Sequence, residues 1–230
     1  MKHSAIGNRL LSCAQFVRQG AYFADIGTDH AYLPLFLLKS GRIDRAVCAD
    51  INAGPLESAK RNAADEGCLD KISFHLTDGA EGLSDLGITD YAICGMGGEL
   101  ISAIISRAPH LLKPGTRLIL QPMTKQAHLR RFLAESGFFL VGESYSYEAG
   151  KYYLALAVEF DGVRREISDF EAEIGKFENS PEARGYFETK INALKKAMQG
   201  KLLSGEKSDY ECRIIDEYND ILGGFNNDGK

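Results

Sequence analysis

The chain has 230 residues, of which 44% are hydrophobic and 26% charged, as is typical of a globular protein. This length suits one domain of ordinary size plus an appendage. The net charge of −5 excludes a generally basic nucleic-acid-binding protein, so any binding of phosphates must rely on a local cluster of Lys and Arg. The sequence contains no apolar run long enough to span a membrane and no signal-peptide pattern at its start.

Cysteine and histidine usage argues against disulfide bonds and metal sites. The five cysteines are scattered without a CxxC pair, at Cys13, Cys48, Cys68, Cys94 and Cys212. Their odd number and mostly apolar contexts predict reduced thiols in a cytoplasmic protein. The histidines are equally dispersed, so we expect no metal ion. The oligomeric state stays open, with a monomer slightly favoured.

Strand-like and helix-like segments alternate along the first 160 residues. In chain order we expect a helix at 4–19, a strand at 22–26, a helix at 31–40, a strand at 45–50, a helix ending near 66, strands at 71–76 and 90–94, a helix at 99–112, a strand at 117–121, a helix at 125–136, and strands at 138–147 and 152–160. Apolar runs of this kind suit strands that are buried on both faces. The pattern therefore predicts an α/β protein with a doubly wound, mostly parallel sheet and one antiparallel strand near its end.

After Phe160 the pattern becomes helical. Apolar residues recur at helical spacing at Ile167, Phe170, Ile174 and Phe177. A second helix is expected from Pro181, with breaks at Gly200 and Gly205, and a third is expected to stop at Gly223–Gly224, before a frayed tail. We therefore expect two domains, a ligand-binding domain at 1–160 and a helical, coiled-coil-like domain at 161–230.

The turn after the first strand, Asp25-Ile26-Gly27-Thr28-Asp29, is the first candidate binding element. Gly27 lets a ligand approach the backbone, and the following helix start offers free N–H groups. The turn lacks the G-x-G-x-x-G of dinucleotide sites, and Asp29 would repel a phosphate. It favours a nucleoside with a cationic group, and S-adenosyl-L-methionine fits. The alternative is a plain strand–helix turn with a capping Asp.

Polar residues and glycines also end the neighbouring strands. Asp50 suits the hydroxyls of a ribose, although it could equally cap a helix. Asp78-Gly79 suits an adenine amino group, or is a simple turn. The loop Gly95-Met96-Gly97-Gly98 would let the backbone approach a flat ligand, and Gln121 could hold a base edge or merely cap its strand. Cys94 is interpreted as a buried side chain rather than a nucleophile, because no basic residue lies near it in sequence.

Several cations and aromatic residues suit RNA, whose unstacked bases lie on rings and whose phosphates meet cations. The expected RNA-binding residues are Arg9, Lys125, Arg130, Arg131, Lys151 and Tyr152. The alternative for each is an ordinary solvated surface.

Taken together, these motifs resemble the bacterial tRNA (adenine(22)-N1)-methyltransferase family of the TrmK type. The resemblance rests on Arg9-Leu10, the string from Ala24 to Pro34, Ala49 to Asn52, Asp78-Gly79, Gly95 to Gly98, Gln121-Pro122 and Lys151 to Tyr153. It implies a Rossmann-like class I methyltransferase domain with a seven-stranded sheet, a C-terminal coiled-coil-like domain, S-adenosyl-L-methionine as cofactor and adenine 22 of tRNA as target.

The site residues expected from this reading form two sets. Cofactor-binding residues are Asp25, Gly27, Asp29, His30, Asp50, Ile51, Asp78, Gly79, Gly95 and Met96, and residues that hold the base or act on it are Asp29, Gly97 and Gln121. Alignment of adenine N1 with the methyl group should supply most of the rate, because the N1 lone pair needs no strong base. Two alternatives remain: a non-catalytic RNA-binding protein that uses the cofactor as a ligand, and a methyltransferase for another acceptor.

Overall fold

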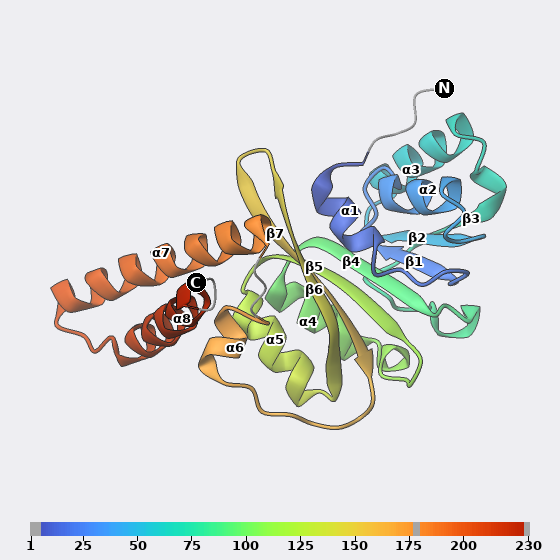
Figure 1. Cartoon of the computed structure of the whole chain (residues 1–230). Coiled ribbons are helices and arrows are strands. Elements are labelled where there is room, and N and C mark those ends of the chain that lie inside the picture. The colour runs from blue at the N-terminus through green and yellow to red at the C-terminus, as the bar shows by residue number, and fades with distance from the viewer. Residues whose placement is uncertain (1–5, 177–179, 228–230) are drawn as a thin grey trace.

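The computed structural model describes residues 6–176 and 180–227. Its centre is a seven-stranded sheet with the strand order β3-β2-β1-β4-β5-β7-β6 (Figure 1). The strands are β1 (Phe23–Ile26), β2 (Ala46–Asp50), β3 (Ile72–Leu76), β4 (Asp90–Gly97), β5 (Arg117–Thr124), β6 (Phe138–Glu148) and β7 (Lys151–Phe160). All neighbours are parallel except β7, which is antiparallel to both β5 and β6. The predicted fold class is therefore confirmed.

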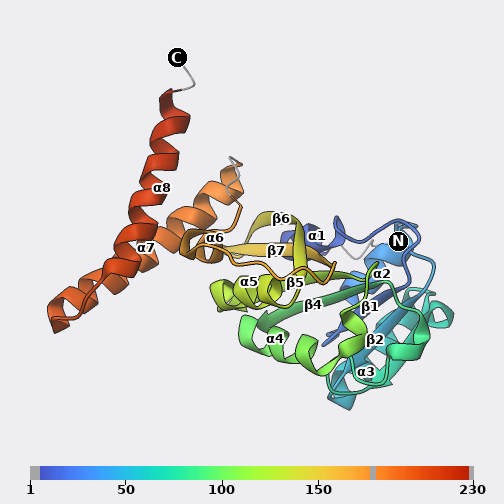
Figure 2. The ribbon, with the colours of Figure 1, turned by 90° about the horizontal axis from the view of Figure 1, so that it is seen from below.

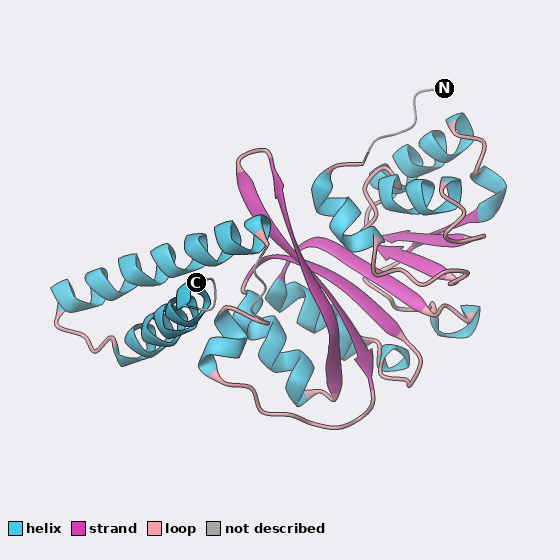
Figure 3. Cartoon of the chain, viewed as in Figure 1, coloured by secondary structure: helices cyan, strands magenta, loops and turns pink. Residues whose placement is uncertain are grey.

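The helices alternate with the strands and then continue beyond the sheet (Figure 3). They are α1 (Asn8–Ala14), α2 (Tyr32–Lys39), α3 (Ala53–Asp65), α4 (Gly98–Arg107), α5 (Gln126–Glu135), α6 (Asp169–Glu173), α7 (Pro181–Ser204) and α8 (Asp209–Asn227), with short 3₁₀ turns at Leu69–Lys71, Ser84–Leu86 and Pro109–Leu111.

Two apolar cores cover the two faces of the sheet. On one face α1, α2 and α3 pack on the strands through residues such as Cys13, Leu35 and Ala59. On the other face α4 and α5 pack through Ile101 and Leu129, and the same core continues without a break into α6, α7 and α8. Alternate residues of one strand enter opposite cores, as Phe23 and Ala24 do, which explains why the central strands are apolar throughout.

Several element boundaries differ from the sequence expectation. The first helix covers residues 8–14 instead of 4–19. The chain turns after it, and the backbone N–H of Arg18 donates to Asp90 at the amino end of β4. The helix after β4 ends at Arg107, since Pro109 cannot continue it. Strands β4 and β5 extend to Gly97 and Thr124, through irregular pairing at Cys94, Met96 and Gly97.

The helical region also differs in detail. Helix α6 is only five residues long and begins with a capping box between Ser168 and Glu171. Phe177 lies outside the described residues. Helix α7 passes through Gly200 and ends at Gly205, which has a φ of 76°. Helix α8 continues past Gly223–Gly224 to Asn227, so the predicted stop at those glycines is wrong.

Helices α7 and α8 form a hairpin that projects from the β6–β7 end of the sheet (Figure 2). A buried ion pair fixes its base. Arg130 on α5 is 8% exposed, and its Nε lies 2.7 Å from Oε1 of Glu143 on β6, whose side chain is 2% exposed. Arg130 also donates to the carbonyl of Ala172 in α6, and Tyr145 donates to Glu143. The helical region is thus joined to the sheet through shared core and shared polar contacts.

This geometry corrects one sequence prediction. Arg130 was expected to bind RNA, but it is buried and paired with Glu143. A guanidinium that is buried in this way and paired with a carboxylate holds the junction together, instead of standing free on the surface as a phosphate contact.

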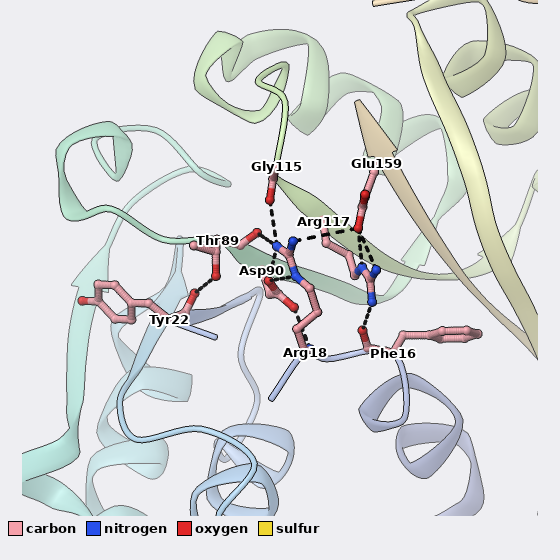
Figure 4. A network of polar contacts seen from close by, with 8 residues as sticks. All are labelled: Phe16, Arg18, Tyr22, Thr89, Asp90, Gly115, Arg117 and Glu159. Atoms are coloured by element: carbon pink, nitrogen blue, oxygen red, sulfur yellow. Dashed lines mark hydrogen bonds and ion pairs between the residues drawn. The ribbon is translucent and has the colours of Figure 1, made fainter. Parts of the chain in front are cut away.

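A second polar network fastens the chain that follows α1 to the amino ends of the strands (Figure 4). The backbone N–H of Arg18 and its Nε each donate to the buried carboxylate of Asp90 at 2.9 Å. The Arg18 guanidinium also donates to the carbonyl of Gly115. Arg117 binds Glu159 of β7 at 2.7 Å and the carbonyl of Phe16. These contacts fix residues 16–18, just after α1, at the amino ends of β4 and β5.

Candidate active site

A cavity of about 400 Å³ opens at the carboxyl ends of the central strands, where β1 and β4 are neighbours. Ligands of doubly wound sheets bind at this edge. The lining residues come from α1, β1 and its following turn, α2, β2 and β4: Arg9, Leu10, Asp25, Gly27, Asp29, Tyr32, Leu33, Asp50, Cys94, Gly95 and Met96.

The turn after β1 forms the floor of this cavity. Gly27 has a φ of 73°, and an added Cβ there would meet the Cε of Met96. His30 and Ala31 also have positive φ values, of 62° and 55°, although neither is a glycine. Such strained residues persist where the surrounding structure holds them and are concentrated at functional sites. Asn62 of α3 supports the turn by donating to the carbonyl of His30 at 2.9 Å.

Three carboxylates line the cavity. Asp25 is buried and accepts a 2.6 Å hydrogen bond from Thr28. Burial raises the pKa of Asp25 to about 6; the hydrogen bond from Thr28 opposes this shift, and the charges of Asp50 and Asp29 add to it. Asp50 accepts the backbone N–H of Asn52 through one oxygen. Asp29 has a 75% exposed side chain and lies 3.2 Å from His30 Nε2.

Arg9 is the cation in the cavity wall. Its Nη1 donates to Oε1 of Gln121 at 2.8 Å, and the same oxygen accepts the backbone N–H of Gly95 at 3.0 Å. The guanidinium lies 5.9 Å from the ring centre of Tyr153. The backbone N–H of Arg9 donates to Glu148 in the β6–β7 hairpin at 2.9 Å. Contacts from three strands thus fix the position of this positive charge.

Gln121 does not have the role that was expected from the sequence. Its side chain is fully buried, its oxygen is used by Arg9 and Gly95, and its nitrogen faces the sulfur of Met123. It therefore positions Arg9 and the start of the glycine-rich loop instead of holding a base itself.

The glycine-rich loop approaches its neighbours closely. A Cβ on Gly98 would clash with the carbonyl oxygen of Lys125, so the start of α4 can pack against the end of β5 only through a glycine. Cys94 precedes the loop and faces Cys13 at 3.7 Å between sulfurs. This contact and burial raise the pKa of the Cys94 thiol well above its ordinary value, which disfavours a nucleophilic role.

Some residues expected to bind the cofactor, and Gly97, which was expected to hold the base, lie outside the lining of the cavity. Ile51 is exposed next to Asp50. Asp78 follows β3 and pairs with Arg107 at 2.9 Å, while Gly79 packs on Ile104. Gly97 caps the start of α4. These positions lie along the same sheet edge as the cavity but are not among its lining residues, and their contacts with a ligand remain predictions.

The other residues expected to bind RNA are spread over the surface. Lys125 is exposed, has a φ of 56° and lies 3.8 Å from Glu99. Arg131 pairs with Asp169 at 2.6 Å. Lys151 is exposed at the tip of the β6–β7 hairpin, and Tyr152 packs its ring over Gly185 of α7. The structure does not bring these four side chains into one cluster.

Tyr32, Leu33 and Leu10 line the cavity but were not expected there. Tyr32 is exposed, and its ring stacks on the ring of His30, with the two ring centres 5.3 Å apart. Their place in the sequence could have indicated this, because Tyr32 and Leu33 follow closely after the turn at Asp29. Across the described ranges, no three His, Cys, Asp or Glu side chains cluster as a metal site, and no helix is long and apolar enough to cross a membrane.

Comparisons with known proteins agree with this architecture. The family model described as "Methyltransferase domain" matches residues 6–156. The tRNA (adenine(22)-N(1))-methyltransferase of Bacillus subtilis strain 168 is 35% identical over 159 residues, which is 69% of this chain and 67% of that protein.

Solved structures match over nearly the whole chain. The B. subtilis m1A22 tRNA methyltransferase TrmK superposes with a TM-score of 0.78 at 27% identity, covering 96% of this chain and 97% of that one. Streptococcus pneumoniae Sp1610, in complex with S-adenosyl-L-methionine, gives a TM-score of 0.80 at 33% identity and covers 92% and 100%.

The fold and the cavity are thus those of a methyltransferase domain. Within that class, the chain belongs to the tRNA (adenine(22)-N(1))-methyltransferase family, the TrmK type, as the sequence motifs had predicted.

Proposed function

We propose that the protein transfers a methyl group from S-adenosyl-L-methionine to N1 of adenine 22 in tRNA. The observation that carries the proposal is the cavity at the β1–β4 edge, which combines one fixed cation, Arg9, with the carboxylates of Asp25, Asp29 and Asp50. Family membership supplies the substrate class. Five free cysteines and an RNA substrate support a cytoplasmic location.

The residues of the cavity fit this cofactor. Asp50 has one carboxylate oxygen left to accept from ribose hydroxyls, since the other accepts from Asn52. Gly27 lets the turn pass close to Met96 in the cavity wall, because a Cβ at this position would collide with the Met96 Cε. Arg9 suits the methionine carboxylate, and Asp25 and Asp29 suit its ammonium group.

When bound, S-adenosyl-L-methionine supplies a methyl group on a cationic sulfur. The lone pair of adenine N1 would form the new bond to the methyl carbon as the sulfur–carbon bond breaks, leaving a neutral thioether and a positively charged methylated adenine. The protein therefore has to align and desolvate the base more than to remove a proton beforehand. Asp29, exposed in the cavity wall, can stabilise the positive charge on the methylated base.

The target adenine has to leave its stacked position to reach this cavity. The backbone of the Gly95–Gly98 loop, which begins in the cavity wall, is positioned to border the base. Helices α7 and α8 share one apolar core with the sheet, in which Tyr145 of β6 packs on Tyr186 and Phe187 of α7, so we propose that they orient the body of the tRNA.

The test is a methyl-transfer assay with tritiated S-adenosyl-L-methionine and an unmodified tRNA transcript, followed by digestion to nucleosides. We expect label in 1-methyladenosine, and loss of that label when adenine 22 is replaced by guanine. Undiminished label in the replaced transcript would refute the site. Measurable cofactor binding with no label in any tRNA would refute the reaction and favour a non-catalytic binder.

A further inference from the structure

A second cavity lies next to the candidate active site, on another side of α1. It is a groove of about 380 Å³, within the range of about 300–1,000 Å³ common for ligand sites. Its walls are α1, residues 144–147 of the edge strand β6, and Glu182 at the start of α7. Figure 1 shows the β6–β7 hairpin standing between α1 and α7. Helix α1 thus borders both cavities, with Arg9 and Leu10 toward one and Asn8, Leu11, Ser12 and Gln15 toward the other.

The groove contains polar groups without partners. Ser146 is 5% exposed, and its buried hydroxyl oxygen has no hydrogen-bond partner among the residues that the structure describes. A buried hydroxyl left unpaired costs free energy that a ligand could recover. Asn8 and Gln15 each donate through their amide nitrogen, to the carbonyls of Tyr147 and Ser12, which leaves their amide oxygens for a ligand.

The chemistry of the wall selects the kind of ligand. Neither lysine nor arginine is among the lining residues, and the charged one is Glu182, so a phosphate is disfavoured. The amide oxygens and the carboxylate accept hydrogen bonds, as the exocyclic amino groups of adenine, guanine and cytosine require. Tyr147 is 48% exposed beside Tyr152 and offers a ring on which a base can stack.

We propose that this groove binds a second, unstacked base of the tRNA, one that carries an amino group, through Glu182, Ser146 and Tyr147. The inference rests on the proposed function, because the groove can meet an RNA base only if tRNA is the substrate of the neighbouring site. A base in the groove lies across α1 from the catalytic cavity, a separation of about one helix diameter, roughly 10 Å. The groove would hold the RNA strand while the target adenine occupies the active site.

The test measures affinity for an unmodified, fluorescein-labelled tRNA transcript by anisotropy at fixed salt, for the wild type and for Glu182→Gln, Ser146→Ala and Tyr147→Ala. Each loss of one contact should weaken binding about 3- to 10-fold, as expected for one hydrogen bond or a partly stacked base. Affinity for S-adenosylhomocysteine should stay within twofold, and thermal unfolding identifies any variant that fails to fold.

The control is Glu188→Gln, which removes the same charge from an exposed position of α7. If charge alone matters, Glu182→Gln and Glu188→Gln should both tighten tRNA binding, because each removes repulsion from phosphates. The proposal would be overturned if Glu182→Gln bound tRNA as tightly as the wild type or more tightly, and Ser146→Ala and Tyr147→Ala kept wild-type affinity. The groove beside the edge strand β6 would then be a candidate site for a peptide strand instead. Wild-type methyl transfer, measured in parallel, tests the proposed function separately.

Discussion

The proposed contact between Arg9 and the carboxylate of the cofactor can be tested by replacing Arg9 with alanine. In Arg9→Ala the cavity keeps its three carboxylates and loses its cation. The framework should survive, because the oxygen of Gln121 still accepts from Gly95 and the contact from Glu148 is to the backbone of Arg9.

The expected magnitude follows from the kind of contact. A hydrogen bond between charged groups contributes about 1.5–3 kcal/mol, and its loss leaves Asp25, Asp29 and Asp50 to repel the ligand carboxylate. Affinity for S-adenosylhomocysteine should therefore fall roughly 10- to 150-fold. Arg9→Lys should recover part of this loss, since it restores the charge without the planar guanidinium.

Isothermal titration calorimetry with two ligands separates this role from a structural one. S-adenosylhomocysteine carries the carboxylate, and 5′-methylthioadenosine lacks the amino acid part entirely. We expect Arg9→Ala to weaken the first and to leave the second within threefold. Arg61→Ala, an exposed arginine on α3, is the matched control. Equal losses for both ligands, or none for either, would refute the assignment.

Four further outcomes follow from the structure. Because burial raises the pKa of Asp25 to about 6, the folded state binds an extra proton between about pH 4 and pH 6. The free energy of unfolding should fall as pH rises through that window, by up to about 3 kcal/mol, and Asp25→Asn should abolish the fall in urea titrations across pH. Cofactor affinity should rise above pH 6, where Asp25 is ionised and can bind the ammonium group; a flat profile would contradict this. Glu143→Gln should lower the free energy of unfolding by about 3–5 kcal/mol in chemical denaturation, because it leaves the Arg130 charge unpaired. Joint replacement by Arg130→Met and Glu143→Leu should lower it less. A loss below about 1 kcal/mol for Glu143→Gln would show that this ion pair does not stabilise the junction. Asp29→Ala should fold normally and lose most turnover on tRNA, and turnover like that of the wild type would exclude Asp29 from the mechanism.

Burial explains where the predictions from sequence failed. Gln121 and Arg130 have the side chains expected of RNA contacts, but both are turned inward and paired, Gln121 with Arg9 and Arg130 with Glu143. Their partners lie 112 and 13 residues away, so no local pattern reveals them. Gly223–Gly224 was expected to end α8, yet the helix continues to Asn227.

The sequence by itself determined the alternation of strands and helices, the class of fold and the polar strand ends that line the cavity. These features are local, because a buried strand must be apolar and a sharp turn near a ligand needs Gly27 or a similarly permissive residue. Tertiary structure alone decided that Arg9 faces the carboxylates, that Arg130 joins the helical region to the sheet, and that α1 and β6 enclose a second groove. Each of these depends on contacts between distant segments, which form only when the sheet brings those segments together.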